Sequence, residues 1–501
     1  AGVRASTIVN STGGAVNVRA RHNFGENKKA NAFARSGSGG IVAGSGAFAV
    51  ATNSANVSTM SGVGSKVSAG AGIELSAKSM EIADSKAEGL AVGGFGIGVS
   101  FAESNANGAV HSRFDGSVSN AASFKVESVG QSTADAEATA AAGGVLLGGS
   151  GSIATANASP TIEALVGAGT INVSGKVDVT AYSEGSAEAD ALGIAVSGGI
   201  GAGVSIATAE VSPTIRAKVQ GASIITTSGN VTIQATYNYT ADGKSAIDKG
   251  AIANATTASG GALVGVQGAV TDATVAAQLE TAVTGASTLS AGGAVQLRSY
   301  ANEKAIADAS GVAVGGGAAV GATLADATIK GAVLTHFDGK LTSGASLALE
   351  GKVDTKADAS GTAIGGALLF GGNGTSANAT IEPEVRTYIG GSGDVTVSGN
   401  VSLATTILTE ADAFASAVTI GGGAAVGATP VEARIESTAE TAIRGGASVT
   451  TSSGNVSLLA ANNFADGKFL TGTGANVSTS MLTAGGVAVS VSNLTATAEA
   501  D

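Results

Sequence analysis

Apolar and polar positions alternate along most of this chain, and clusters of glycine interrupt the alternation. In residues 307–329 (ADASGVAVGGGAAVGATLADATI), the alternation runs up to Gly315, Gly316 and Gly317 and resumes after them. A period of two is typical of β-strands. Each such segment therefore predicts two long strands that fold back on each other at the glycine cluster, like a hairpin.

Helix is the competing interpretation of the same segments. Alanine is the best helix former, and residues 132–142 (STADAEATAAA) could form a turn or two of helix. Each glycine in a helix interior costs about 1 kcal/mol relative to alanine, however. Because every segment carries several glycines, the pattern favours strands.

The glycine-rich segment recurs along the whole chain, at intervals of about 50 residues that are sometimes longer. Its copies are marked by Gly44, Gly93, Gly148, Gly198, Gly265, Gly315, Gly365, Gly421 and Gly486. Between many of them stands a second block, as in ASIITTSGNVTI from Ala222, with two β-branched runs around a small-residue turn. Serine, glycine and asparagine accept such turns at little cost. The unit of the chain is thus a repeat of several strands.

A longer period is superimposed on this unit. Polar insertions read HNFGENKKANAF from His22, YNYTADGKSAIDKG from Tyr237 and NNFADGKFLTGTG from Asn462, and the glycine markers that follow them are 221 residues apart. Four units therefore make a super-unit. We expect residues 1–501 to form one continuous repeat array with no separate globular domain, and to be either a window of a longer array or a protomer whose ends stack on further copies.

A repeat of this size cannot bury its faces alone, so copies must stack. The expected fold is all-β: an elongated β-solenoid of about nine units, with stacked parallel strands and glycine-rich, hairpin-like arms. One coil per unit predicts a stack of roughly 43 Å, and two shorter coils per unit predict roughly 86 Å. One wide coil is favoured, because inward alanine and glycine let the two sheets of an arm approach closely.

Composition and charge narrow the classes of function. The net charge of −12 disfavours sequence-independent binding to nucleic acid. Zero cysteine excludes disulfides and thiolate metal sites. No long apolar stretch lacks glycine and serine interruptions, so we expect no membrane span.

Candidate chemistry is sparse. His22, His111 and His336 are far apart in sequence, and nothing supports a zinc site, another metal site or a cofactor. Carboxylates recur on the alanine-rich strands; they are Asp135, Glu137, Glu188, Asp190, Asp308, Asp358, Glu410 and Asp412. A solenoid glycosidase or lyase would place its acids in one local site, whereas these acids are periodic. We therefore expect no enzyme.

The insertions are the best candidates for contact with a partner, because loops on a rigid scaffold commonly carry binding residues. They concentrate the scarce aromatic and basic side chains of the chain. The predicted surface contact residues are Tyr237, Tyr239, Asp242, Lys244, Phe464, Asp466 and Lys468. The competing interpretation is a solvated bulge with one packed aromatic ring.

The turns SGNVTI, SGNVSL and SGKVDV between β-branched runs, in a cysteine-free chain rich in glycine, alanine, serine and threonine, resemble those of large repetitive bacterial exoproteins of the filamentous-haemagglutinin type. Leukotoxin-like filamentous adhesins belong to the same group. The resemblance covers essentially the whole chain. It implies secretion across an outer membrane and a place at the cell surface or in extracellular matrix, including biofilm.

The expected function is therefore that of a structural or adhesive extracellular filament protein. Its expected partners are copies of itself or further repeats of a longer chain, stacked end to end, and glycans or proteins on a host or cell surface. A self-assembling head-to-tail filament subunit is the first alternative. An ice- or surface-binding solenoid is the second, although no regular T-x-T array supports it.

Overall fold

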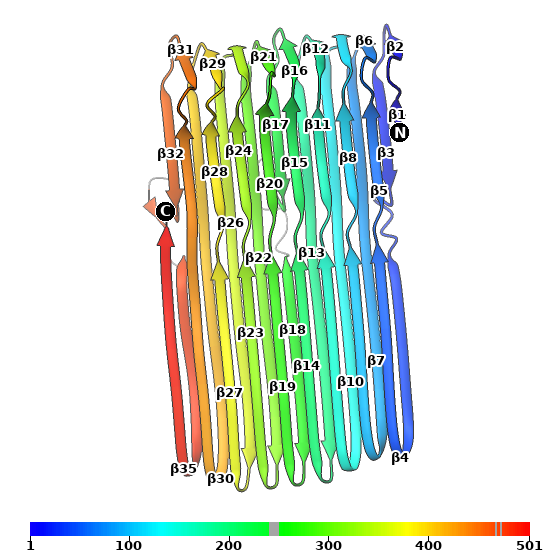
Figure 1. Ribbon diagram of the computed structural model, residues 1–501, viewed down its shortest axis with the longest axis vertical. Coiled ribbons are helices and arrows are strands. Elements are labelled where there is room, and N and C mark those ends of the chain that lie inside the picture. The colour runs from blue at the N-terminus through cyan, green and yellow to red at the C-terminus, as the bar shows by residue number, and fades with distance from the viewer. Residues whose placement is uncertain (240–249, 466–467, 471–472, 501) are drawn as a thin grey trace.

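The chain folds into a stack of wide β-coils that lie side by side (Figure 1). The structure is a computed structural model that describes residues 1–239, 250–465, 468–470 and 473–500. Strands make up 82% of the structure. Across the described residues, no helix is long and apolar enough to cross a membrane.

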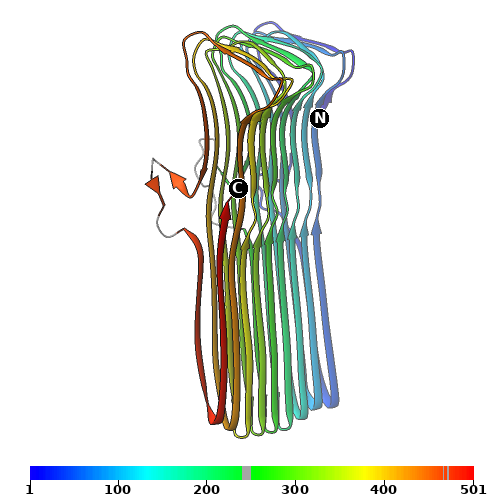
Figure 2. The same ribbon diagram turned by 60° about the vertical axis from the view of Figure 1, so that its left-hand side comes forward.

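One coil can be followed from Val177 to Tyr237. Strand β13 (Val177–Ser197) runs to the far tip of the coil, and β14 (Ile200–Val211) returns from it. The chain then forms a third face with β15 (Thr214–Gln220) and a short fourth face with β16 (Ala222–Thr226). Strand β17 (Val231–Tyr237) begins the next coil on top of β13. In Figure 2 these segments give a broad closed end above a long, flat arm.

The register shows one coil per repeat unit. Val177 pairs with Phe124 in the coil before it and with Val231 in the coil after it, and both pairs of strands are parallel. Side chains that bond between neighbouring coils are commonly 53 residues apart, as Ser152 and Ser205 are. The second insertion lengthens this spacing, so Asn254 and Asp190 are 64 residues apart. Two shorter coils per unit are thereby excluded.

The strands of the described residues fall into three sheets. The largest has 24 strands. Its arm and long-face strands are β3 (Val16–His22), β4 (Ala30–Asn53), β7 (Gly72–Ala106), β10 (Ser123–Ala158), β13, β14, β17, β18 (Ala251–Gly261), β19 (Val264–Val275), β22 (Ala294–Gly315), β23 (Ala318–Ile329), β26 (Ser346–Ala367), β27 (Phe370–Ile381), β30 (Val401–Ile443), β32 (Val456–Asn462) and β35 (Gly474–Ala500). Its third-face strands are β1 (Gly2–Val3), β5 (Asn56–Ser61), β8 (Ala109–Phe114), β11 (Thr161–Val166), β15, β20 (Gln278–Thr284), β24 (Ala332–Phe337) and β28 (Glu384–Ile389).

The fourth face is a separate nine-stranded sheet with one strand from each coil. Its strands are β2 (Ile8–Ser11), β6 (Lys66–Ala69), β9 (Ser117–Asn120), β12 (Gly169–Val173), β16, β21 (Thr288–Ala291), β25 (Lys340–Ser343), β29 (Asp394–Val397) and β31 (Ser448–Thr451). The third sheet is the small antiparallel pair of β33 (Phe464–Ala465) and β34 (Lys468–Phe469) in the last insertion.

The longest axis of the molecule follows the strands, not the stack (Figure 1). A strand such as β22, with 22 residues, spans about 70 Å at ~3.3 Å per residue. Nine stacked strands span only about 43 Å at ~4.8 Å each. The expectation of a rod elongated along its stacking axis is therefore wrong for this chain, which forms a broad slab, because one coil is wider than the whole stack is long.

The arms are not hydrogen-bonded hairpins. The two limbs of an arm face each other through their side chains, while each limb pairs with the same limb of the neighbouring coils, as β13 does with β10 and β14 with β19. The prediction of strands that fold back at glycine clusters is confirmed. The hairpin interpretation is wrong in its pairing, since the alternation of residues does not tell which strand supplies the hydrogen bonds.

Side-chain size decides the thickness of each part of the coil. The broad end buries large residues, among them Phe114, Phe124, Ile162 and Leu289. The interior of the arms buries alanine, glycine, serine and threonine, and Cα atoms of facing limbs such as β13 and β14 come within 8 Å of each other. Facing sheets ordinarily lie ~10 Å apart. Small inward residues thus flatten the arm.

Three of the four prolines mark one corner of the coil. Pro160, Pro213 and Pro383 stand between the returning limb and the third face, where the chain leaves one strand and begins another. Pro430 does not share this place, because it lies inside β30. The ladder between β27 and β30 skips this point, as expected for a residue without an N–H donor.

Candidate functional site

The three insertions leave the coil at equivalent points through the same device. Asn23, Asn238 and Asn463 all have left-handed backbone conformations, with φ of 53°, 51° and 49°. Asparagine tolerates this conformation better than other non-glycine residues. The points at which the insertions leave the coil therefore form a row along one edge of the stack, near the base of the arms.

The side chains of Asn238 and Asn463 also replace part of the interrupted ladder. The amide oxygen of Asn463 accepts a hydrogen bond from the backbone N–H of Thr409 at 2.8 Å, and its amide nitrogen donates to the Thr409 hydroxyl at 3.0 Å. The amide oxygen of Asn238 accepts in the same way from the N–H of Gly185 at 3.1 Å. The neighbouring coil thus keeps its hydrogen bonds where the strand departs.

Tyr237 is not a surface contact residue. Its side chain is fully buried, and its hydroxyl donates to the carbonyl oxygen of Gly185 at 3.1 Å. A side chain at Gly185 would press against the Tyr237 ring, so the glycine supplies the space that the ring fills. Burial raises the pKa of Tyr237 well above its usual range. The prediction of surface contact is wrong for this residue, which belongs to the core.

Tyr239 is also buried, with 1% of its surface exposed, on the outer side of the coils that follow. Its hydroxyl donates to the Asp354 carboxylate, its ring lies 5.9 Å from that of Tyr300, and the Lys352 ammonium lies 5.2 Å from its ring centroid. The second insertion therefore begins by anchoring itself across neighbouring coils. The surface-contact prediction is wrong for Tyr239 as well.

The other predicted contact residues divide into two groups. Phe464 is half-buried and Lys468 is exposed, and both lie in the small antiparallel pair that projects from the last coil (Figure 2). Asp242, Lys244 and Asp466 lie outside the described residues. Surface contact at Phe464 and Lys468 stays a prediction.

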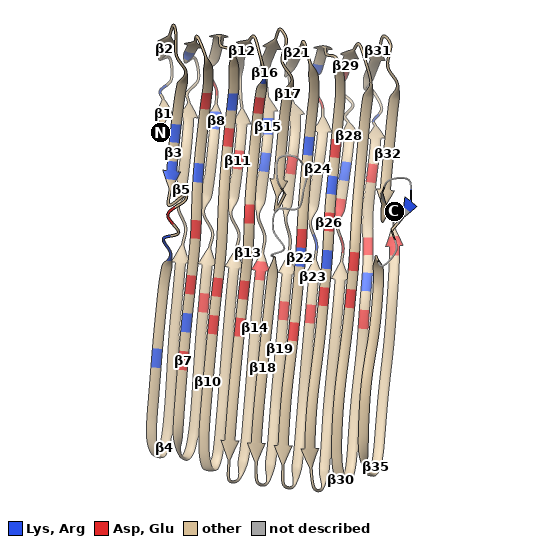
Figure 3. Ribbon diagram, turned by 180° about the vertical axis from the view of Figure 1, so that it is seen from behind, with Lys and Arg blue, Asp and Glu red and all other residues tan. Residues whose placement is uncertain are grey.

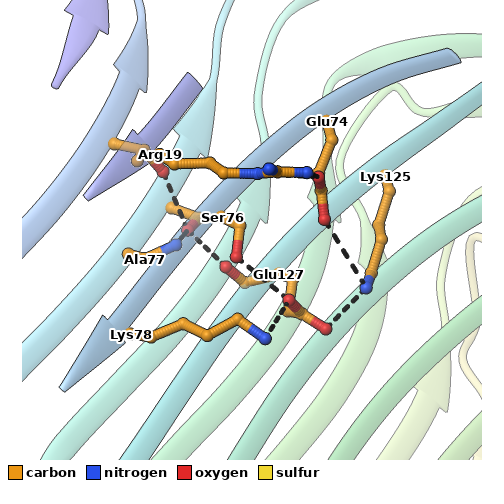
Figure 4. A network of polar contacts seen from close by, with 9 residues as sticks. Arg19, Glu74, Ser76, Ala77, Lys78, Lys125 and Glu127 are labelled. Atoms are coloured by element: carbon orange, nitrogen blue, oxygen red, sulfur yellow. Dashed lines mark hydrogen bonds and ion pairs between the residues drawn. The ribbon is translucent and has the colours of Figure 1, made fainter. Parts of the chain in front are cut away.

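The outer face of the broad end carries rows of paired charges. Lys125 lies 2.6 Å from Glu127 and 3.9 Å from Glu74, Lys78 lies 2.8 Å from Glu127, and Arg19 binds Glu74 (Figure 4). Partial burial alone would raise the pKa of Glu127, but hydrogen bonds and charges from Lys125 and Lys78 lower it to about 2. Each ion pair joins two neighbouring coils or two nearby residues of one strand. The face is therefore charged, but its charges are neutralised locally.

A shallow hollow lies on this polar face beside the second insertion. Its lining includes Lys125, Lys176, Tyr182, Gln234, Thr236 and Arg298. These side chains offer charged and neutral hydrogen-bonding groups on rigid strands. Such a surface can exchange several hydrogen bonds with a polar ligand such as a glycan.

Two further hollows lie between the insertions, one super-unit apart. They are lined by residues 80–82, 131–133 and 184–186 in the first case, and by residues 302–304, 354–356 and 408–410 in the second. Each crosses three successive coils. The long period of the sequence therefore places equivalent surface features at both sites.

Two glutamates are buried at matching positions inside these coils. Glu81 accepts a hydrogen bond from the backbone N–H of Ala55 at 3.3 Å, and one of its oxygens has no partner among the described residues. Both carboxyl oxygens of Glu303 lack an ordinary hydrogen bond within the described ranges. Burial raises the pKa of Glu81, and it raises that of Glu303 to about 8. Glu303 is therefore largely protonated at neutral pH.

The corner residues opposite these glutamates differ from those of other coils. Ala55 and Gly108 face Glu81, and Ala277 and Gly331 stand at the corresponding corner near Glu303. Three other coils carry proline there, namely Pro160, Pro213 and Pro383, and proline has no N–H and is bulkier. Sequence analysis missed both glutamates. The sequence signal that could have revealed them is a glutamate at a position where the alternation places a buried residue, with a second glutamate at the same position one super-unit later.

The recurring acids form an outward row at the base of the arms (Figure 3). Partial burial and then the nearby carboxylates of Asp84, Glu188, Asp190 and Glu137 raise the pKa of Asp135 to about 6. No three His, Asp or Glu side chains in the described part of the chain are placed to hold a metal ion.

His336 is held by its own coil neighbours. It lies 2.5 Å from the Asp338 carboxylate and 3.4 Å from that of Glu280, and its ring stacks on Tyr388. His111 instead lies 3.5 Å from Glu163. These contacts place both histidines beside the acidic side chains of neighbouring coils, within the rows of paired charges on the outer face.

No known family model, curated protein or solved structure matches this chain.

Proposed function

We propose that this chain is a rigid segment of a β-solenoid filament that serves attachment or matrix formation at the cell surface. The observation that carries the proposal is the parallel pairing of successive coils, from β4 and β7 at one end to β30 and β35 at the other. The nine strands of the fourth face support an array of about nine units. The extracellular location rests on the resemblance to filamentous bacterial exoproteins.

Rigidity follows from how the coils are joined. Every coil is hydrogen-bonded to its neighbours along both limbs of the arm and along the closed end, so bending the stack would break many bonds together. Each face also repeats its side chains every coil or every super-unit. Weak contacts with glycans or proteins would therefore add through multivalency rather than depend on one deep pocket.

A self-assembling filament subunit is the second candidate. Strand β4 pairs with β7 alone and β35 with β30 alone, so both end coils of the described structure offer open parallel edges. An open edge is a ready template for another strand. Head-to-tail contacts that do not close give open filaments.

Electron microscopy of the purified chain over a concentration series tests both candidates. We expect stiff particles that keep their width, and in the self-assembling case they lengthen along the stacking direction as concentration rises. Flexible or globular particles at all concentrations would contradict the scaffold proposal.

Adhesion itself needs a separate measurement. Beads that carry many copies of the chain should bind surfaces coated with glycan or protein at least about tenfold more tightly than one free chain does. The reason is that many weak contacts act together. Beads that bind no better than uncoated beads to any cell-surface glycan or matrix protein would leave only the structural part of the proposal standing.

A further inference from the structure

The distal half of every arm carries no charge. The uncharged segments are 36–53, 89–102, 140–154, 191–207, 255–271, 309–325, 361–377, 413–431 and 477–498. Figure 3 shows the result as a broad uncharged zone below the charged rows. Large aliphatic residues on these segments point outward, as Val92 and Val196 do with more than half of their surface exposed. Exposed apolar areas of this extent mark interaction surfaces.

The outer face of the outgoing limb is corrugated with a period of two coils. One row of stacked positions, which we call the ridge row, alternates glycine with a branched aliphatic residue from coil to coil. Over eight coils it reads, in stacking order, Gly39, Val92, Gly143, Val196, Gly260, Val314, Gly366 and Ile420, and on the last coil the row ends with the small residue Ala484. Ridges therefore repeat at about 9.6 Å, twice the ~4.8 Å coil spacing, with a glycine notch between each two.

The notch glycines are not explained by the chain's own packing. A side chain added at Gly260 or Gly366 would meet nothing within 4 Å, and neither residue has a positive φ. Glycine at the arm tips is different, because a methyl at Gly316 or Gly422 would overlap a carbonyl oxygen of the preceding coil. Glycine inside a strand weakens it and commonly marks close approach of another backbone or ligand. The chain's own packing does not require glycine at these notches, so we expect them to receive a group from another molecule.

We propose that this face of the arm is a lateral interface with a second copy of the chain, with the ridges of one copy seated in the glycine notches of the other. A corrugated face with evenly spaced ridges is complementary to itself when one copy is shifted by one coil. Two copies that face each other with parallel stacks, related by a half-turn about the stacking axis and a shift of one coil, then use the same patch on both copies and place Val314 of one opposite Gly366 of the other.

The area is sufficient for a stable pair. About eight residues along the limb and nine coils give the face about 1,100 Å². One partner in a standard interface buries ~800 Å². A lipid surface fits less well, since a fluid bilayer does not read a 9.6 Å corrugation. The acids at the arm base, such as Asp190, Asp308 and Asp412, would also repel anionic headgroups.

Filling the notches tests the proposal without disturbing the fold. The variant Gly260→Leu/Gly366→Leu should keep the circular dichroism spectrum and weaken pairing by at least tenfold in sedimentation velocity. The matched control is Gly374→Leu, which lies on the returning limb, on the opposite face, and also meets nothing within 4 Å. The control should pair like the unaltered chain. Equal behaviour of the two variants, or an unaltered chain that never pairs sideways, would overturn the proposal.

Cross-linking separates lateral pairs from end-to-end stacks. The chain has no cysteine, so single cysteines report one contact each. A Val314→Cys chain mixed with a Gly366→Cys chain should form a mixed disulfide dimer, whereas a Val314→Cys chain mixed with a Gly374→Cys chain should not. If the chain instead stays unpaired and floats with phosphatidylcholine vesicles, lipid is the occupant of this face and the proposal is wrong.

Discussion

Glycine has two distinct roles at the residue scale. At the arm tips it is required by the preceding coil: a methyl at Gly316 would overlap the carbonyl oxygen of Ala262, and one at Gly422 that of Leu368. On the outer face, Gly260 and Gly366 have open space around the missing side chain. Residue identity alone therefore does not tell what a glycine does; its neighbour in the next coil does.

This difference predicts opposite effects of the same substitution. Gly316→Ala should destabilise the chain by about 2 kcal/mol or more, since backbone atoms must move to relieve the overlap. Gly260→Ala should change stability by less than ~0.5 kcal/mol, as surface substitutions usually do. Urea unfolding followed by circular dichroism compares the two. Similar midpoints for both variants would contradict the assigned roles.

Glu303 predicts an unusual pH dependence. Burial raises its pKa to about 8, against ~4.3 for a solvated glutamate. Between these values the folded state binds more protons than the unfolded one, so stability should fall as pH rises from about 4.3 through 8. Melting temperatures at pH 5, 7 and 9 measure this fall.

The matching variant is Glu303→Gln, which removes the titration. In this variant the melting temperature should fall less between pH 5 and 9, by the part that Glu303 causes. The control Glu210→Gln, at an exposed position of β14, should keep the full fall. The opposite sign holds for Glu127, whose lowered pKa stabilises the fold at neutral pH and stops doing so in acid. Identical pH profiles for Glu303→Gln and the unaltered chain would refute the assignment.

At the scale of elements, alternation predicted the strands but not their partners. A segment such as β22 shows its buried and exposed faces locally, through the period of two. Whether it pairs with the limb that follows it or with the next coil depends on contacts more than 50 residues away, which no local pattern records. The repeat spacing did carry that information, and it favoured one wide coil.

The insertions show the same limit. Aromatic residues in a polar segment predicted surface contact, yet Tyr237 is buried because Gly185, in the coil before it, leaves room for the ring. The shared asparagine at the start of each insertion was visible in the sequence. Its left-handed conformation and its bonds to the neighbouring coil became evident only from the stacked register.

Asn463 predicts how an insertion is held. Asn463→Ala should destabilise the last coil by about 2 kcal/mol, because it combines left-handed strain with lost hydrogen bonds. Asn463→Gly should cost less, since it removes only the bonds. Amide hydrogen exchange at Thr409, whose N–H donates to Asn463, should speed up in both variants. Exposed Asn493→Ala is the control, and an unchanged Thr409 rate in Asn463→Ala would refute this role.

The whole molecule is a slab whose properties follow from one wide coil repeated. Large residues thicken the closed end, small residues flatten the arm, and charge is confined to the end and the arm base (Figure 3). The proposed stacking uses the open edges of the end coils, and the proposed lateral pairing uses the uncharged arm. The two directions are perpendicular, so together they would build a sheet or bundle of filaments rather than a single thread.

Electron cryo-microscopy of the purified 501-residue chain tests the central claim most directly. One wide coil per unit predicts particles that measure at least about 70 Å along the strands and about 43 Å along the stack. The ~4.8 Å repeat between strands should then be perpendicular to the longest axis of the particle. A ~4.8 Å spacing along the longest axis, with a stack near 86 Å, would mean two short coils per unit and would contradict the account.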